Sequence, residues 1–134
     1  MAAQKLPDGI LERLQPCLVL EDNSIVLLDL EQSLVEAGFT RLHTASGLAQ
    51  AAQAVAAHAI RSAILDFRIN SATSVEIAQR LVEKGAVVVF LTGYGMQLNL
   101  PQALAHVRVL SKPADTLTVI ETLAAALNSP GPRP

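Results

Sequence analysis

The residues of this chain best suited to chemistry are a small set of acids, one hydroxyl and one amine. They are the adjacent carboxylates Glu21 and Asp22, a third carboxylate at Asp66, the hydroxyl of Thr92 and the amine of Lys112. Three carboxylates brought together repel one another unless a cation is present, and hard oxygen ligands suit magnesium. A lysine charge and a hydroxyl donor beside that metal can hold an anion. The set therefore predicts a metal-dependent site for a phosphoryl group.

Short apolar runs are expected to position these residues, because each candidate lies at the end of one of them. The runs read as buried strands, and they are residues 17–21, 40–44, 63–66, 86–91 and 107–110. In an open parallel sheet, ligands bind beyond the carboxyl ends of the strands. Strands with these bounds would therefore bring the candidates to one edge of a sheet.

Segments of helical pattern follow the runs. We expect helices over residues 24–37, 47–58, 75–85 and 115–127, with Ser46, Ser74 or Thr73, and Asp115 as N-caps. Between residues 94 and 106, two glycines and Pro101 leave room for about two turns of helix at most. Alternation of strands and helices predicts an α/β fold, a doubly wound parallel sheet covered on both faces.

Length and composition limit the alternatives. The chain has 134 residues, 51% hydrophobic and 16% charged, which suits one domain with an ordinary core. A net charge of −2 gives no basic field for nucleic acid, and the single cysteine, Cys17, excludes an internal disulfide. No segment resembles a signal peptide or a membrane span, so we expect a cytoplasmic protein with no membrane partner.

Four sequence segments resemble the signature segments of response-regulator receiver (CheY-like) domains, in the same order. They are PCLVLEDN, AILDF, VVFLTGYG and VLSKPAD. The resemblance covers Cys17 to about Leu127. It implies a flavodoxin-like sheet of order 2-1-3-4-5, a receiver domain at residues 17–128, an extension or linker at 1–16 with room for a short helix, and a flexible tail at 129–134. The phrase FLTGY is similar to the motif of the stand-alone Phe-Ala-Thr-Gly-Tyr receivers, with Leu91 in place of the alanine.

The resemblance implies a role for each candidate at the acidic site. Asp66 matches the phosphoacceptor, which forms an aspartyl phosphate. Asp22 matches the direct ligand of Mg²⁺ or Mn²⁺ and Glu21 its partner, which acts largely through water. Asp66 itself and the backbone carbonyl of Arg68 complete the expected metal ligands.

Other residues match the parts of the family that hold the phosphoryl group and pass on the signal. Thr92 matches the hydroxyl that moves to a phosphoryl oxygen, and Lys112 matches the cation that pairs with it. The Lys112–Pro113 peptide is expected to be cis. Better-known receivers have an aromatic switch residue where this chain has Val109, so we expect Thr92 and Tyr94 to carry the switch.

The function implied is a phosphorelay receiver, and not an enzyme beyond its own phosphorylation and dephosphorylation. Its partner would be a sensor histidine kinase or a phosphotransfer protein, and it would be a single-domain regulator with a downstream protein target, or a phosphate sink. One alternative is the receiver portion of a hybrid histidine kinase. An alternative from another class is a small magnesium-dependent aspartyl-phosphate hydrolase, although such enzymes expect a second Asp two residues after the nucleophile, where this chain has Arg68.

Overall fold

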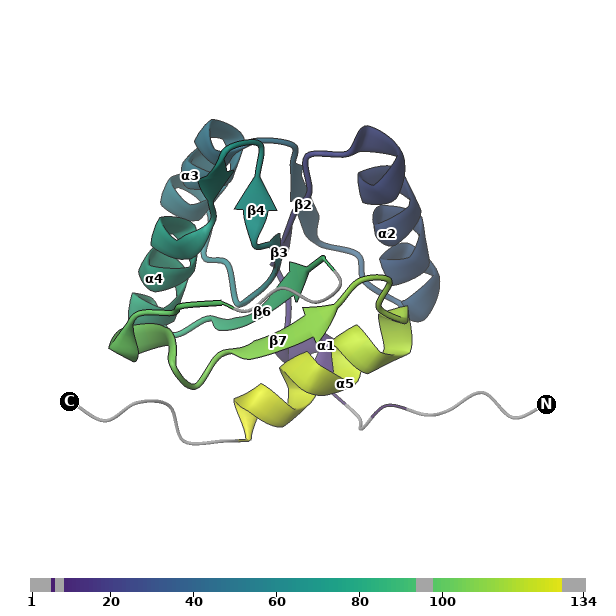
Figure 1. Ribbon diagram of the computed structural model, residues 1–134. Helices are drawn as coiled ribbons and strands as arrows, with labels where there is room; N and C mark the ends of the chain where they lie inside the picture. Colours follow the sequence, from purple (N-terminus) through teal and green to yellow (C-terminus); the bar gives the residue numbers. More distant parts are fainter. Residues whose placement is uncertain (1–5, 7–8, 94–97, 129–134) are drawn as a thin grey trace.

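A five-stranded parallel sheet forms the centre of the protein, in a computed structural model that describes residues 6, 9–93 and 98–128. Its order is β2-β1-β3-β6-β7, all neighbours being parallel (Figure 1). The bounds are Cys17–Leu20 for β1, Leu42–Ala45 for β2, Ser62–Asp66 for β3, Val87–Thr92 for β6 and Arg108–Ser111 for β7. Counted along this sheet, the order is the expected 2-1-3-4-5, so the predicted doubly wound α/β fold is confirmed.

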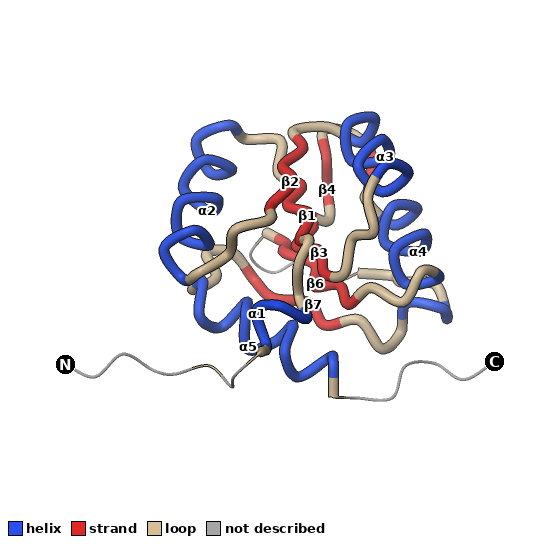
Figure 2. The backbone as a smooth tube through the Cα atoms, turned by 180° about the vertical axis from the view of Figure 1, so that it is seen from behind, coloured by secondary structure: helices blue, strands red, loops and turns tan. Residues whose placement is uncertain are grey.

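Helices cover both faces of the sheet, as Figures 1 and 2 show from opposite sides. One face carries α2 (Ser24–Ala37), α5 (Thr116–Leu127) and the short α1 (Ile10–Arg13), and the other carries α3 (Leu48–Ala57) and α4 (Val75–Glu83). The three inner strands, β1, β3 and β6, are buried on both faces because alternate residues enter the two cores, as Leu18 and Val19 of β1 do. Within the described part of the chain, no helix is both long and apolar enough to span a bilayer.

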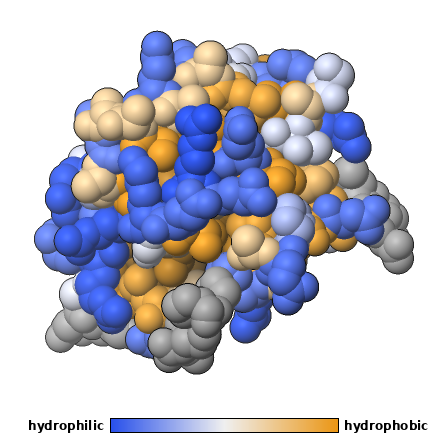
Figure 3. Space-filling model, turned by 90° about the vertical axis from the view of Figure 1, so that its left-hand side faces the viewer, coloured by the Kyte–Doolittle hydropathy of each residue, from blue (hydrophilic) through white to orange (hydrophobic). Residues whose placement is uncertain are grey.

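Polar side chains cross the face formed by α3 and α4, with apolar atoms visible between them (Figure 3). Beneath this face, the rings of Phe67 and Phe90 meet edge to face with centroids 5.5 Å apart. Phe90 lies in β6, next to the central strand β3, and is fully buried. This aromatic contact therefore anchors the residue that directly follows Asp66 to the core.

The segment before β1 packs on the sheet. Ile10 and Leu14 are buried in the same core as α2 and α5, and the Ser62 hydroxyl donates to the Leu14 carbonyl. The Gln15 side-chain oxygen accepts hydrogen bonds from the backbone amides of Thr40 and Arg41, each at 2.7 Å. Because those two amides are used in this way, β2 begins at Leu42 rather than at residue 40.

A small antiparallel hairpin, not expected from the sequence, follows β3. It consists of β4 (Arg68–Ile69) and β5 (Ala72–Thr73), with Arg68 opposite Thr73 and Ile69 opposite Ala72. Asn70, at the turn, has a left-handed backbone with φ 56°. The hairpin therefore fills the connection between the end of β3 and the start of α4.

Of the expected helix caps, Ser46 is wrong, Ser74 has the expected position without a capping hydrogen bond, and Asp115 is confirmed. Gly47, not Ser46, is the N-cap of α3, and the Ser46 amide and hydroxyl both donate to the side-chain oxygen of Gln50. Ser74 occupies the N-cap of α4 but makes no capping bond, because its hydroxyl donates to the Asp66 carbonyl instead. Asp115 caps α5 as expected and accepts from the Thr118 amide at 3.2 Å.

The described residues of the connection between β6 and β7 are irregular, as expected. Its described residues contain only a single turn of 3-10 helix, η1 (Gln102–Leu104), where Leu104 is buried against the α3 and α4 side of the core. Residues 94–97 lie outside the described part of the chain. The expected cis peptide at Lys112–Pro113 is confirmed, and Gln15–Pro16 is a second one.

Candidate functional site

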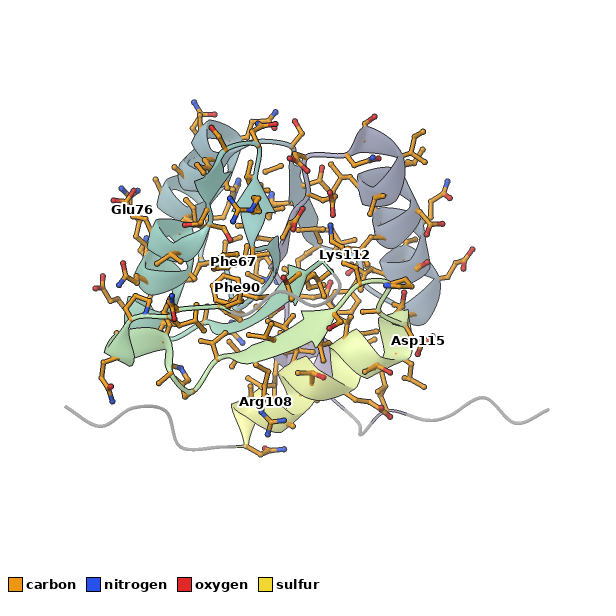
Figure 4. The ribbon with its side chains drawn as sticks, in the orientation of Figure 1. Phe67, Glu76, Phe90, Arg108, Lys112 and Asp115 are labelled. Atoms are coloured by element: carbon orange, nitrogen blue, oxygen red, sulfur yellow. The ribbon has the colours of Figure 1, made fainter. Side chains whose placement is uncertain are left out.

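The carboxyl ends of four neighbouring strands bring the candidate residues to one edge of the sheet. Asp66 is the last residue of β3 and Thr92 the last of β6, while Lys112 directly follows β7. Glu21 directly follows β1, which lies next to β3 in the sheet. Figure 4 shows Lys112 beyond the end of the β7 arrow. Parallel pairing therefore gathers residues that are far apart in the sequence.

Three carboxylates form the centre of this site. Glu21, Asp22 and Asp66 each offer an oxygen atom, and these atoms all lie within 4.8 Å of one another. Glu21 and Asp66 are buried, whereas Asp22 is partly exposed. Hard oxygen donors at this separation fit a divalent cation of the magnesium type, and the cluster is open to solvent on the Asp22 side.

Lys112 bridges two of the carboxylates. Its Nζ donates to Glu21 Oε1 at 2.7 Å and to Asp66 Oδ2 at 3.0 Å. Burial lowers the pKa of Lys112, but the hydrogen bonds that Lys112 donates to Glu21 and Asp66, and the charges of those carboxylates, outweigh burial and leave that pKa above its ordinary value. Lys112 is therefore a fixed positive charge beside Asp66. Three carboxylates and one ammonium still leave a net negative charge at the site, which a bound cation would neutralise.

The Asp66 carboxylate lies where its charge is poorly solvated. Burial raises the pKa of Asp66, repulsion from Glu21 and Asp22 raises it further, and the hydrogen bond from Lys112 lowers it only in part. A cation bound beside Asp66 would favour the ionised form, which is the nucleophilic one. The site thus combines an acid of raised pKa with groups able to hold it charged.

Thr92 carries a hydroxyl that is only loosely held. The residue is buried, and its Oγ1 donates to the Gly93 carbonyl at 3.5 Å, which is long for a hydroxyl hydrogen bond. Little free energy is lost if that hydroxyl turns to a better acceptor. Thr92 can therefore donate to an anion placed at the edge of β6.

Other predicted site residues lie apart from this cluster or outside the described chain. Arg68 is exposed in β4, two residues beyond Asp66, and the metal-ligand role of its carbonyl stays a prediction. Tyr94 is among the residues that the structure does not describe, so its switch role also stays a prediction. Val109, three residues before Lys112, is 39% exposed on β7.

Two residues that sequence reasoning missed make hydrogen bonds to this site. The Asn70 amide donates to Asp22 Oδ2 at 2.9 Å, and the Ser74 hydroxyl donates to the Asp66 carbonyl at 2.8 Å. Asn and Ser at residues 70 and 71 are common turn residues, and that signal could have marked the hairpin. The contact with Asp22, 48 residues away, had no signal in the sequence.

Comparisons with known proteins support the receiver fold. No family model and no curated protein matches the chain. Among solved structures, SdrG from Sphingomonas melonis Fr1 is 29% identical with a TM-score of 0.71, over 86% of this chain and 98% of that one. A response regulator receiver protein from Sinorhizobium medicae WSM419 is 24% identical with a TM-score of 0.70, over 84% of this chain and 94% of that one.

A third similar structure contains ligands. It is a response regulator protein from Burkholderia pseudomallei with a phosphorylated aspartic acid, a calcium ion and citrate, 20% identical with a TM-score of 0.68, over 84% of this chain and 69% of that one. The chain thus shares the flavodoxin-like receiver fold with response regulator receiver domains.

Proposed function

We propose that this chain is a phosphoacceptor receiver domain of a two-component phosphorelay, with Asp66 as the acceptor. The observation that carries the proposal is the bridge made by Lys112 between Asp66 and Glu21 at the edge of the sheet. It places a buried nucleophile, a cation and an acidic cluster within contact of one another. The phosphorylated aspartic acid and the calcium ion of the Burkholderia pseudomallei protein support the same interpretation.

The proposed reaction transfers a phosphoryl group from a histidine of a sensor kinase or a phosphotransfer protein. An Asp66 carboxylate oxygen attacks phosphorus, the new O–P bond forms as the P–N bond breaks, and the electron pair returns to the imidazole. Lys112 exchanges its contact with Asp66 for one with a phosphoryl oxygen, and the Thr92 hydroxyl donates to another. The chain thereby positions the reactants and neutralises charge, the two main contributions to phosphoryl transfer.

A divalent ion, Mg²⁺ or Mn²⁺, would supply further charge neutralisation at the phosphoryl oxygens. The side chains of Asp22 and Asp66 and the carbonyl of Arg68 would hold it, with Glu21 acting largely through water. The fit rests on the separation of the carboxylate oxygens and on their hard character.

The surface of α2 supports docking of a protein partner beside this site. The helix begins two residues after Asp22, and its apolar side chains Ile25, Leu28 and Val35 are 79%, 55% and 55% exposed. Their spacing places them on one side of the helix. Exposed apolar side chains that gather on one side of a helix are a feature of protein interaction sites, whereas single ones are common on any surface, and we propose that the phosphodonor protein docks here.

The type of receiver is also a proposal. The FLTGY segment favours a stand-alone receiver that acts as a single-domain regulator or a phosphate sink, with Thr92 and Tyr94 carrying the switch. The alternative is the receiver portion of a hybrid histidine kinase. We propose a cytoplasmic protein, as the single free cysteine, Cys17, supports.

Labelling with acetyl phosphate tests the assignment. With Mg²⁺ present, intact-mass analysis should show the wild-type protein gaining one phosphoryl group, whereas Asp66→Asn should gain none. Asp29→Asn removes an exposed carboxylate from α2 and should be labelled like the wild type. Equal labelling of Asp66→Asn would contradict the proposal.

The hydrolase alternative makes a different prediction. A hydrolase would release phosphate from a phosphomonoester over many turnovers, whereas a receiver would accept a phosphoryl group from acetyl phosphate and leave phosphomonoesters intact. Repeated release of phosphate from a phosphomonoester that depends on Asp66 would contradict the receiver proposal and support the hydrolase.

A further inference from the structure

The β4–β5 hairpin is anchored at its base to the backbone of the phosphoacceptor strand. The Ser74 amide donates to the Phe67 carbonyl at 2.9 Å, and the Ser74 hydroxyl donates to the Asp66 carbonyl at 2.8 Å. Ile69, in β4, is buried in the core shared with α3 and α4. The base of the hairpin is therefore held in a fixed position relative to Asp66.

The tip of the hairpin contacts Asp22, one of the three carboxylates of the acidic cluster. Asn70 and Ser71 form the two-residue turn, and the Asn70 amide donates to Asp22 Oδ2 at 2.9 Å. Among the described residues, Asn70 is the one non-glycine residue with positive φ, at 56°. Asn adopts this conformation more readily than other residues, and β-branched residues adopt it least.

Asp22 has a different partner from the other two carboxylates. Lys112 contacts Glu21 and Asp66, whereas the Asp22 side chain receives the Asn70 amide. This hydrogen bond uses one carboxylate oxygen and leaves lone pairs on both for other partners. The hairpin can thus fix the direction of Asp22 without occupying the whole carboxylate.

We infer that Asn70 is a positioning residue for metal binding, because its left-handed backbone holds an amide against Asp22 and keeps that carboxylate directed into the cluster. The inference rests on the proposed function, in which Asp22 is a metal ligand. The hairpin then joins the phosphoacceptor strand to the metal-binding acid through main-chain atoms, and residue 70 must tolerate positive φ.

Substitutions at residue 70 test this role by magnesium affinity, measured by isothermal titration calorimetry. Asn70→Gly keeps the conformation and the amide, so its affinity should stay within about twofold of the wild type. Asn70→Val disfavours the conformation and should weaken binding about tenfold, the scale of losing a hydrogen bond to a charged group. Thr73→Val changes an exposed residue of the same hairpin and should leave the affinity unchanged.

A double-mutant cycle separates positioning from general damage to the fold. If Asn70 acts through Asp22, Asn70→Val should have no further effect on magnesium affinity in the Asp22→Ala background. Circular dichroism would show whether each variant is folded, and if Asn70→Val is unfolded then Asn70→Ala, which imposes less strain, takes its place.

The outcomes distinguish this inference from the function on which it rests. If the wild type binds magnesium and Asn70→Val binds it with the same affinity, the inference alone is overturned. It is also overturned if Asn70→Val weakens magnesium binding equally with Asp22 present and in the Asp22→Ala background. Absence of magnesium binding by the wild type overturns both the inference and the metal part of the proposed function. Loss in Asn70→Val, recovery in Asn70→Gly and no additional loss without Asp22 support it.

Discussion

Replacing Lys112 with methionine tests the electrostatics of the site most directly. The side chains of Glu21, Asp66 and Lys112 are 3%, 10% and 29% exposed. Methionine has a similar length and carries no charge, so Lys112→Met removes the ammonium with little loss of packing. The change leaves a buried Glu21 carboxylate beside Asp66 without the cation that contacts both.

The expected loss of stability follows from the distances. At 2.7 Å and an effective dielectric constant near 20, the attraction between Lys112 and Glu21 is about 6 kcal/mol, and desolvation of both groups offsets much of it. Removing one partner of a buried pair typically costs about 3–5 kcal/mol. Because nearly a third of the lysine side chain is in water, we expect the lower end, about 3 kcal/mol.

Urea unfolding at pH 7 in the absence of divalent ions measures this cost. For a domain of this size, about 3 kcal/mol corresponds to a fall in Tm of roughly 10 °C. The double variant Glu21→Gln, Lys112→Met should recover more than half of the loss, because no charge is then left buried at residue 21. Mg²⁺ should also restore part of it by supplying another cation.

The pH dependence of the stability loss in Lys112→Met provides a second check on this electrostatic argument. The pKa of Asp66 is already raised by burial, and loss of Lys112 raises it further, so the deficit of Lys112→Met should shrink as pH falls. The control Arg80→Met removes an exposed ion pair with Glu76 at 3.8 Å and should cost less than about 1 kcal/mol. A loss no larger than that control would refute the reasoning.

Three further outcomes are expected. Asp22→Ala should weaken magnesium binding in a calorimetric titration, whereas Asp29→Ala should not; equal affinities would place the metal elsewhere. Burial raises the pKa of Cys17 from 9.0 to about 12, so the thiol ionises first in the unfolded chain and the free energy of unfolding should fall as pH rises above about 9. In urea titrations, Cys17→Ala should reduce this dependence of the free energy of unfolding on pH. An unchanged dependence would contradict the prediction. The pKa of His43 is lowered by burial and then by repulsion from His58, whose ring stacks on that of His43 with centroids 3.9 Å apart. In an NMR titration the pKa of His43 should lie below 6.5 and should rise in His58→Gln. Absence of that rise would contradict the repulsion from His58.

The positions of the strand-end residues could be predicted from the sequence because two simple rules determine them. Apolar runs buried on both faces mark parallel strands, and the ends of parallel strands meet at one edge of a sheet. Asp66, Thr92 and Lys112 each end or follow such a run, so their common edge followed without any knowledge of contacts. Helix α2 has the expected bounds because Asn23 caps its start and Gly38, with φ 117°, ends it.

The hairpin and the side-chain partners could not be predicted in the same way. Two-residue strands such as β4 and β5 are too short to show alternation, and neither pairs with the main sheet. Ser74 has the sequence features of a helix cap, but its hydroxyl instead bonds the Asp66 carbonyl, a choice set by the chain's path around β3. These details depend on tertiary contacts, which leave no local pattern.

The packed segment before β1 has a consequence for anyone who transplants this unit into a chimaera. A cut at Cys17, where the sequence pattern of the first strand begins, would strip Ile10 and Leu14 from the core. It would also remove the Gln15 oxygen that the amides of Thr40 and Arg41 share, and the carbonyl that accepts from Ser62. The portable unit therefore begins no later than the turn at Gly9, and a splice site chosen by strand pattern alone would yield a weakened graft.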